Sequence, residues 1–269
     1  MLKIRNGRIP SAVRTKLAEY QRDVDAQSTY PERVSRAKKK FKARNTKRNR
    51  TFAAVRRKLA ELCGGIRRCM YCEDSVADEV EHFKPKDLYP QVVFAWRNYL
   101  YSCGQCNGGK NNRFSVIEPE AGGLVDVTRP RDSPVTPPPR GDAALIDPRR
   151  ENPLDFIILD LRETFAFTPF ADAGTVEHKR AEYTIDILRL NERDYLREAR
   201  KNAMVSYVAC LARYVELRNG RAPAREVAQL KRCIQGSPHP TVWAEMQRQH
   251  GHHDSIYTLF HAAPEALDF

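Results

Sequence analysis

The sequence contains no long apolar run and no recognisable secretory signal. No stretch approaches the ~18 consecutive apolar residues that a membrane-spanning helix requires. The first residues, MLKIRNGRIPSAVR, lack the apolar core of a signal peptide. These absences argue against a membrane or secreted protein, and we expect a cytoplasmic protein with no membrane partner.

Acidic residues are scarce in the N-terminal quarter, and the stretch from 33 to 59 contains none. Residues 1–68 hold 21 Lys/Arg and five Asp/Glu, a net charge of +16, so the other 201 residues sum to −4. This concentration predicts a nucleic-acid partner, because each neutralised phosphate releases condensed counterions. The alternative is a set of solvated basic helices that bind nothing.

Apolar spacing predicts an α+β protein that is mainly helical. Residues 10–60 are helix-prone, and we expect one long helix, or two broken near Asn45, that end at Gly64-Gly65. Residues 156–170 contain two β-prone runs that predict a hairpin. From Val176 onward the pattern is helical, with Asn191 as an N-cap, Gly220 as a stop, and shorter helices at 223–235 and 240–250.

Prolines divide the chain. Residues 117–153 hold eight of the 17 prolines, which is typical of a loop or linker on the surface. We therefore expect four parts: a basic helical N-terminal segment (1–65), a cysteine module (66–116), a Pro-rich linker (117–155) and a mainly helical C-terminal domain (156–269).

Four of the seven cysteines form two CxxC pairs, and a reducing cytoplasm favours metal over disulfides for such pairs. Two CxxC turns close one tetrahedral site, so we predict structural zinc bound by Cys69, Cys72, Cys103 and Cys106. A full set of four ligands leaves no open position for catalysis.

Cys63, Cys210 and Cys233 lie outside this spacing, and the latter two fit apolar helical patterns as small core residues. The HGHHD cluster (250–254) is interpreted as a polar helix end rather than a metal site.

A second group of polar residues lies between the two CxxC pairs and just after them. Glu81-His82 follows a valine-rich stretch, the β-prone run VVFAW (92–96) comes next, and then Asn98. Asn107, Lys110 and Asn111 share one face if a helix begins after Cys106. We expect a hairpin followed by a helix, with zinc at its base.

The segments EHFKP, WRN and CGQCNGGK resemble those of the HNH endonucleases, which have a ββα-metal fold with zinc knuckles. The resemblance covers about 45 residues and includes the nine-residue step from Asn98 to Asn107. It implies that His82 is the general base, that Glu81 and Asn107 bind a catalytic Mg²⁺ or Mn²⁺, and that Asn98 orients the histidine loop. Lys110 would hold a neighbouring phosphate.

The chemistry of these residues agrees with such roles. A neutral imidazole with a pKa near ~6.5 can take a proton from water, and a carboxylate with an amide oxygen leaves a hard cation open positions. Adjacent strand residues point to opposite faces, so Glu81 and His82 converge only at a strand end or in a distorted loop, which Pro85 favours. In the alternative interpretation these residues are an ordinary histidine, a solvated carboxylate and turn-capping asparagines.

Two later segments, LIDPRRENPLDFI (145–157) and TIDILRLNERDYLREAR (184–200), resemble those of the HNH subunits of Septu and related retron antiphage systems. That resemblance implies a partner ATPase of the ABC/SMC-like class that controls cleavage. The chain itself has no GxxxxGK[ST] phosphate-binding loop.

Three functions therefore remain open from the sequence. The first is a metal-dependent endonuclease acting on DNA, with RNA or transfer RNA as other possible substrates. The second is a non-catalytic, zinc-stabilised nucleic-acid-binding or scaffold module. The third is a standalone restriction or homing nuclease.

Overall fold

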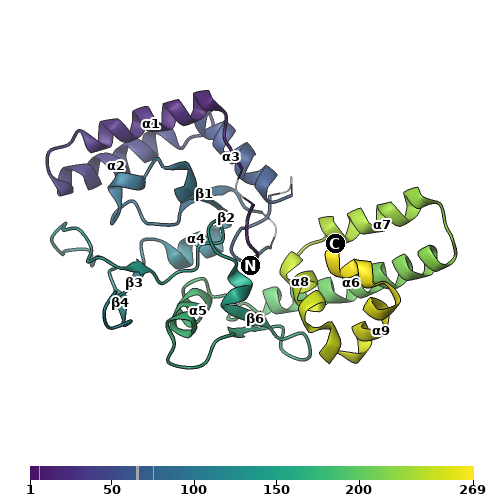
Figure 1. Ribbon diagram of the computed structural model, residues 1–269. Helices are drawn as coiled ribbons and strands as arrows, with labels where there is room; N and C mark the ends of the chain where they lie inside the picture. Colours follow the sequence, from purple (N-terminus) through teal and green to yellow (C-terminus); the bar gives the residue numbers. More distant parts are fainter. Residues whose placement is uncertain (6, 65–66, 75) are drawn as a thin grey trace.

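The computed structural model describes residues 1–5, 7–64, 67–74 and 76–269 (Figure 1). These described residues form an α+β protein that is about half helical, with three small antiparallel sheets. The basic N-terminal helices and the C-terminal helices that follow residue 193 lie at opposite ends of the view in Figure 1. The expected α+β, mainly helical class is thus observed at this coarse level.

Three helices form the N-terminal segment: α1 (Ser11–Asp25), α2 (Tyr30–Arg44) and α3 (Arg50–Leu62). The break near Asn45 is confirmed, since Asn45 is the C-cap of α2. A second break at 26–29 was not expected. There a capping box starts α2. The Thr29 side chain accepts a hydrogen bond from the Glu32 backbone amide, and the Glu32 carboxylate accepts one from the Thr29 backbone amide. Helix α3 ends at Leu62; Gly65 of the predicted stop lies outside the described residues.

The cysteine module contains β1 (Glu79–His82), β2 (Tyr99–Ser102) and α4 (Gly104–Lys110) in the order strand, strand, helix. The strands pair antiparallel, with Glu79 opposite Ser102 and His82 opposite Tyr99. The expectation of a strand at 92–96 is wrong. Its first residue ends the 3₁₀ turn η1 (Pro90–Val92), its last residue begins the 3₁₀ turn η2 (Trp96–Asn98), and residues 93–94 form a turn between them. Pro90, just before the run, has no N–H to donate to a sheet.

The Pro-rich segment contains short strands that the sequence did not indicate. Strand β3 (Ser115–Ile117) pairs with both β4 (Leu124–Asp126) and β5 (Asp142–Ala143), in the order β4-β3-β5. Directly after β5 the chain is buried at Ala144, Leu145 and Ile146. This segment therefore contributes to the core as well as to the surface.

The C-terminal part begins with the hairpin of β6 (Ile157–Leu159) and β7 (Phe167–Pro169), which confirms the hairpin predicted for 156–170. Helices and 3₁₀ turns account for most of the remainder: η3 (Pro153–Asp155), α5 (Val176–Ile187), α6 (Asp194–Asn219), α7 (Ala224–Gly236), α8 (Pro240–Gln249), η4 (His250–His252), α9 (Asp254–Ala262) and η5 (Pro264–Asp268). None of the helices in the described ranges has the length and apolar character needed to cross a membrane.

Two details of this part correct or confirm the sequence analysis. Gly220 is the C-cap of α6, as expected. Asn191 is not its N-cap, which is Arg193. The Asn191 amide instead bonds both backbone groups of Phe167, so its side chain joins the end of α5 to β7.

Candidate functional site

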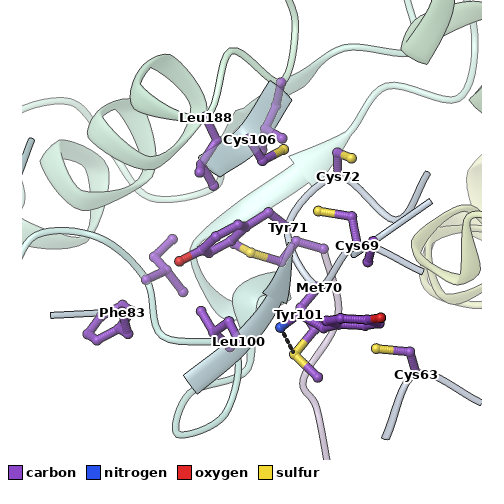
Figure 2. Packing of buried hydrophobic residues seen from close by; sticks show 14 of the residues in the cluster. Cys63, Cys69, Met70, Tyr71, Cys72, Phe83, Leu100, Tyr101, Cys106 and Leu188 are labelled. Atoms are coloured by element: carbon purple, nitrogen blue, oxygen red, sulfur yellow. Dashed lines mark hydrogen bonds between the residues drawn. The ribbon is translucent and has the colours of Figure 1, made fainter. Parts of the chain in front are cut away.

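The four cysteines of the two CxxC pairs form one cluster. Cys69 and Cys72 lie on the loop before β1, Cys103 is the N-cap of α4, and Cys106 lies in the first turns of that helix. Their Sγ atoms all lie within 4.8 Å of one another. Figure 2 shows Cys69, Cys72 and Cys106 in the same region, among buried apolar side chains.

The cluster fits a zinc ion. A tetrahedron with Zn–S bonds of about 2.3 Å has sulfur–sulfur edges of roughly 3.8 Å, and the Cys72 and Cys103 Sγ atoms are 3.8 Å apart. Hydrogen bonds among the thiols lower the pKa of Cys103 but raise those of Cys72 and Cys106, so a bound cation would be needed to hold all four as thiolates. Arg193 donates to Cys106 Sγ at 3.3 Å and would partly balance the negative charge of four thiolates. The cluster can therefore hold structural zinc.

The other cysteines and the histidine cluster show no second site. Cys63 is buried, but Cys210 is only half-buried and Cys233 is exposed, so the prediction that both are core residues fails for Cys233. Among the described residues, the four cysteines are the only group of three or more His, Cys, Asp or Glu side chains close enough to hold a metal ion. His250 Nδ1 lies 2.8 Å from the Gln247 carbonyl oxygen in α8, and His253 Nε2 lies 3.4 Å from the Leu161 carbonyl oxygen, just after β6.

Glu81 faces helix α4 and is ion-paired there. Lys110 Nζ lies 2.7 Å from Glu81 Oε1 and donates a second bond of 2.8 Å to the His82 carbonyl oxygen. The Lys110 side chain is completely buried. The lysine therefore joins the end of α4 to the end of β1, and it is not on the surface where a phosphate could reach it.

Asn107 lies on the same side of the hairpin as Glu81 but bonds a different carboxylate. Its Nδ2 donates to Glu79 Oε2, and Glu79 precedes Glu81 by two residues, which places both carboxylates on one face of β1. Asn111 does not share the Asn107–Lys110 face, because α4 ends at Lys110 and Asn111 is a C-cap with φ of 43°. That expectation was wrong.

His82 is the last residue of β1, and its ring is enclosed. Its Nε2 lies 2.9 Å from the Val93 carbonyl oxygen, and its ring centroid lies 4.3 Å from that of Phe41 in α2. Only 3% of the residue is exposed. Burial, with a further contribution from the positive charge of Lys86, lowers the pKa of His82 to about 3, so the imidazole is neutral at neutral pH.

The Val93 carbonyl fixes the tautomer of His82. A carbonyl oxygen only accepts hydrogen bonds, and this one also accepts from the Tyr99 hydroxyl at 2.9 Å. His82 Nε2 must therefore carry the hydrogen, which leaves Nδ1 with a free lone pair. Nδ1 has no hydrogen-bond partner among the described residues. This nitrogen is the one that could accept a proton.

Asn98 holds the loop between the strands. Its Oδ1 accepts from the Lys84 amide at 2.8 Å, while its Nδ2 donates to the Lys84 and Val92 carbonyls, each at 3.1 Å. These three bonds tie the chain after His82 to the residue before Val93, whose carbonyl accepts from His82. Asn98 is thus placed to set the position of the His82 ring indirectly.

Each of the predicted cation ligands has another partner in this structure. Glu81 is neutralised by Lys110, and Asn107 is bonded to Glu79. The described hydrogen bonds join Glu81 to α4 and the His82 ring to Val93; none joins the two side chains. In this arrangement Glu81 and Asn107 do not fit a divalent cation, since the ammonium group already supplies the positive charge.

Several contacts of this centre escaped the sequence analysis. Glu79 could have been found by its two-residue step from Glu81. Phe41 could not, because it reaches His82 from a separate helix. The basic helices carry exposed cations, and Lys39, Lys42, Lys47 and Arg48 form no ion pair within the described part of the chain.

Comparison with known proteins gives one partial similarity. No protein-family model matches the chain, and no solved structure matches it. The Septu protein PtuB of Bacillus thuringiensis is 47% identical to the chain over 75 residues. The matched part is 26% of this chain and 29% of that protein, so less than a third of either is aligned.

Proposed function

We propose that this chain is an HNH-class nuclease that hydrolyses phosphodiester bonds, with DNA as the favoured substrate, and that it serves as the effector of a Septu-like antiphage system. The observation that carries the proposal is His82: a neutral imidazole, oriented by the Val93 carbonyl, with Nδ1 free. It lies at the end of β1, next to Glu81, in a module closed by four thiols. The partial similarity to a Septu protein supports the defence role.

In this proposal His82 is the general base. Nδ1 takes a proton from a water molecule, the water oxygen forms a bond to phosphorus, and the bond from phosphorus to the 3′ oxygen breaks. The departing oxygen then takes a proton from solvent. Asn98 acts as a positioning residue, because its three bonds fix the loop that carries the Val93 carbonyl.

Two contacts must open before this chemistry can occur, so the structure corresponds to a resting state. Phe41 covers the His82 ring, and water must reach Nδ1. Lys110 neutralises Glu81, and Mg²⁺ or Mn²⁺ could bind Glu81 and Asn107 only after that ion pair separates. Once released, Lys110 would be free to contact a phosphate.

Control by a second protein agrees with these closed contacts. An uncontrolled nuclease with a strongly basic N-terminal segment would endanger the cell's own nucleic acid. We propose an ABC/SMC-like ATPase as the partner, because the chain contains no phosphate-binding loop of its own. Helices α6–α9 offer the surface for such a partner.

A specific observation favours a second candidate, the non-catalytic nucleic-acid-binding or scaffold module. A base with a pKa of about 3 is weak at neutral pH, and a buried Lys–Glu pair is a common structural element. In that case His82 is a core residue that pins the Val93 loop. A standalone restriction or homing nuclease would retain the chemistry without the partner.

The deciding experiment is cleavage of plasmid DNA and of RNA with Mg²⁺ or Mn²⁺, comparing the wild type, His82→Ala and the surface control His252→Ala. We expect His82→Ala to lose activity by a factor of about 10² or more; its zinc content should stay the same, and because the ring is buried the assay is run well below its lowered melting temperature. The control should cut like the wild type. Phe41→Leu, which shortens the side chain over His82, should cut faster.

Equal cutting by the wild type and His82→Ala would remove His82 from the mechanism. Absence of cutting by the wild type and by Phe41→Leu, with either metal, would favour the non-catalytic module.

A further inference from the structure

A cavity of about 660 Å³ lies between α1 and the loop that precedes β2. One wall comes from residues 7–9 and from the face of α1 that carries Arg14. The opposite wall is the segment from Phe94 to Arg97, and Arg149 closes one side. None of the residues assigned above to zinc or to catalysis lines this cavity.

The cavity is strongly positive. Four arginines line it, namely Arg8, Arg14, Arg97 and Arg149, and none of its described lining residues is acidic. Arg8, Arg14 and Arg97 are exposed, and within the described ranges none of them forms an ion pair with a carboxylate. Helix α1 begins at Ser11, beside this wall, and its N-cap Pro10 supplies no side-chain acceptor. The positive end of the helix dipole adds to the charge of the arginines.

Arg149 is a buried residue that is held in the cavity wall by several contacts. It is 1% exposed, its Nη1 donates to the Trp96 and Tyr99 carbonyls at 2.6 and 2.7 Å, and its guanidinium lies 4.5 Å from the Trp96 ring centroid. Its Nε and Nη2 expose almost no surface and have no hydrogen-bond partner among the described residues, so this guanidinium acts on the cavity through its charge. A buried cation with unused donors is costly unless an anion compensates it. Asp147 attracts this guanidinium, but no hydrogen bond joins the two side chains.

The remaining lining is apolar and partly aromatic. Ile9, Leu17, Phe94 and Trp96 provide a surface suited to a flat ring. The volume lies within the range of about 300–1,000 Å³ that is typical of small-molecule sites. A simple anion would leave this apolar surface uncovered, whereas a nucleotide covers it with the base and offers its phosphate to the arginines.

We propose that this cavity binds a nucleoside phosphate, either a free nucleotide or one nucleotide of a strand. The site is joined directly to the His82 loop. Val93, whose carbonyl holds His82, immediately precedes the cavity wall at 94–97, and Asn98 immediately follows it. A ligand bound in the cavity would therefore contact the same short segment that orients the His82 imidazole. The binding itself does not depend on nuclease activity.

The test is isothermal titration calorimetry of the full chain in EDTA. The ligands are AMP, ATP, adenosine, inorganic phosphate and a short 5′-phosphorylated oligothymidylate. The variant Arg14→Glu/Arg97→Glu is compared with the matched control Arg225→Glu/Arg232→Glu on α7, where both arginines are exposed. Each variant changes the net charge by the same amount, so a general charge effect cancels.

We expect one nucleotide or one oligonucleotide per chain, with adenosine and phosphate much weaker. Arg14→Glu/Arg97→Glu should lose about tenfold or more in affinity, as removal of charge-assisted bonds to phosphate predicts, and the control should match the wild type. Saturation by free AMP or ATP identifies a small-molecule site, and binding of the oligonucleotide alone identifies a strand nucleotide. Because the titrations are carried out in EDTA, they measure binding without metal-dependent cleavage, so a failure of this proposal and a failure of the nuclease proposal are distinguishable. No binding of any ligand, or equal losses in the two double variants, would overturn it.

Discussion

The four-cysteine cluster and the surroundings of His82 belong to the same hairpin module. They differ in how far apart in the sequence their contacting residues lie. The cluster comes from two CxxC turns at the base of the hairpin. The His82 environment needs Phe41 from α2, the Val93 carbonyl and the loop held by Asn98. The cluster can be identified from residue spacing, whereas the protonation and accessibility of His82 depend on tertiary packing. Changes that affect one region and spare the other test whether they are independent.

The largest expected effect is loss of the cluster. Cys103→Ala removes one of four thiolates and leaves three without a complete tetrahedron, so metal should be lost and the module should unfold. We expect a loss of stability on the order of 5 kcal/mol, or roughly 10–20 °C in melting temperature. Metal analysis and thermal unfolding measure both.

Cys233→Ala is the matched control, because Cys233 is exposed and lies outside the cluster. It should retain the wild-type metal content and melting temperature. A Cys103→Ala protein with unchanged metal and melting would show that the thiols do not hold a structural ion.

The second largest expected loss of stability concerns the Glu81–Lys110 pair, which lies between the two regions. Lys110→Met should cost about 3–5 kcal/mol, because Glu81 is left as a buried charge without its partner. The double variant Glu81→Gln/Lys110→Met should recover much of that loss, since no unpaired charge remains. Urea unfolding of the two single variants and the double variant gives the coupling energy. Additive losses would show that the two groups are solvated independently.

Much of the four-cysteine cluster and little of the His82 environment could be predicted from the sequence. The CxxC spacing specifies two ligands per turn, so local geometry was enough. The second strand was misplaced because VVFAW has high β propensity, yet Pro90 and the three bonds of Asn98 bend that run into 3₁₀ turns. Tyr99–Ser102 pairs with β1 instead. Here a tertiary hydrogen-bond network overrode local propensity.

Side-chain partners were harder to predict than elements. The pattern indicated that Glu81 and Asn107 share a site, whereas Asn107 bonds Glu79 and Glu81 bonds Lys110. All four residues lie on facing elements, and sequence spacing alone cannot choose among the possible pairings. The Phe41 contact spans 41 positions of sequence, and its chemistry gives no signal beyond an apolar stripe on α2.

The smallest expected effect is the pH dependence that His82 adds to stability. Its pKa in the folded protein, about 3, lies below the ordinary value near ~6.5, so the unfolded chain binds the proton more readily. The contribution of His82 is therefore complete above pH ~6.5 and is lost as the pH falls toward 3. The comparison is His82→Gln, which retains an N–H donor for the Val93 carbonyl but cannot titrate.

Below pH ~6.5 the stability advantage of the wild type over His82→Gln should shrink by up to about 1.4 kcal/mol per pH unit, which is roughly 2 kcal/mol at pH 5. Urea unfolding of both proteins at pH 7.5, 6 and 5 measures this difference, and the other titrating groups cancel between them. Parallel stability curves would mean that the ring is already open to water in solution. The comparison therefore separates a closed resting state from an accessible base without any need to observe cleavage.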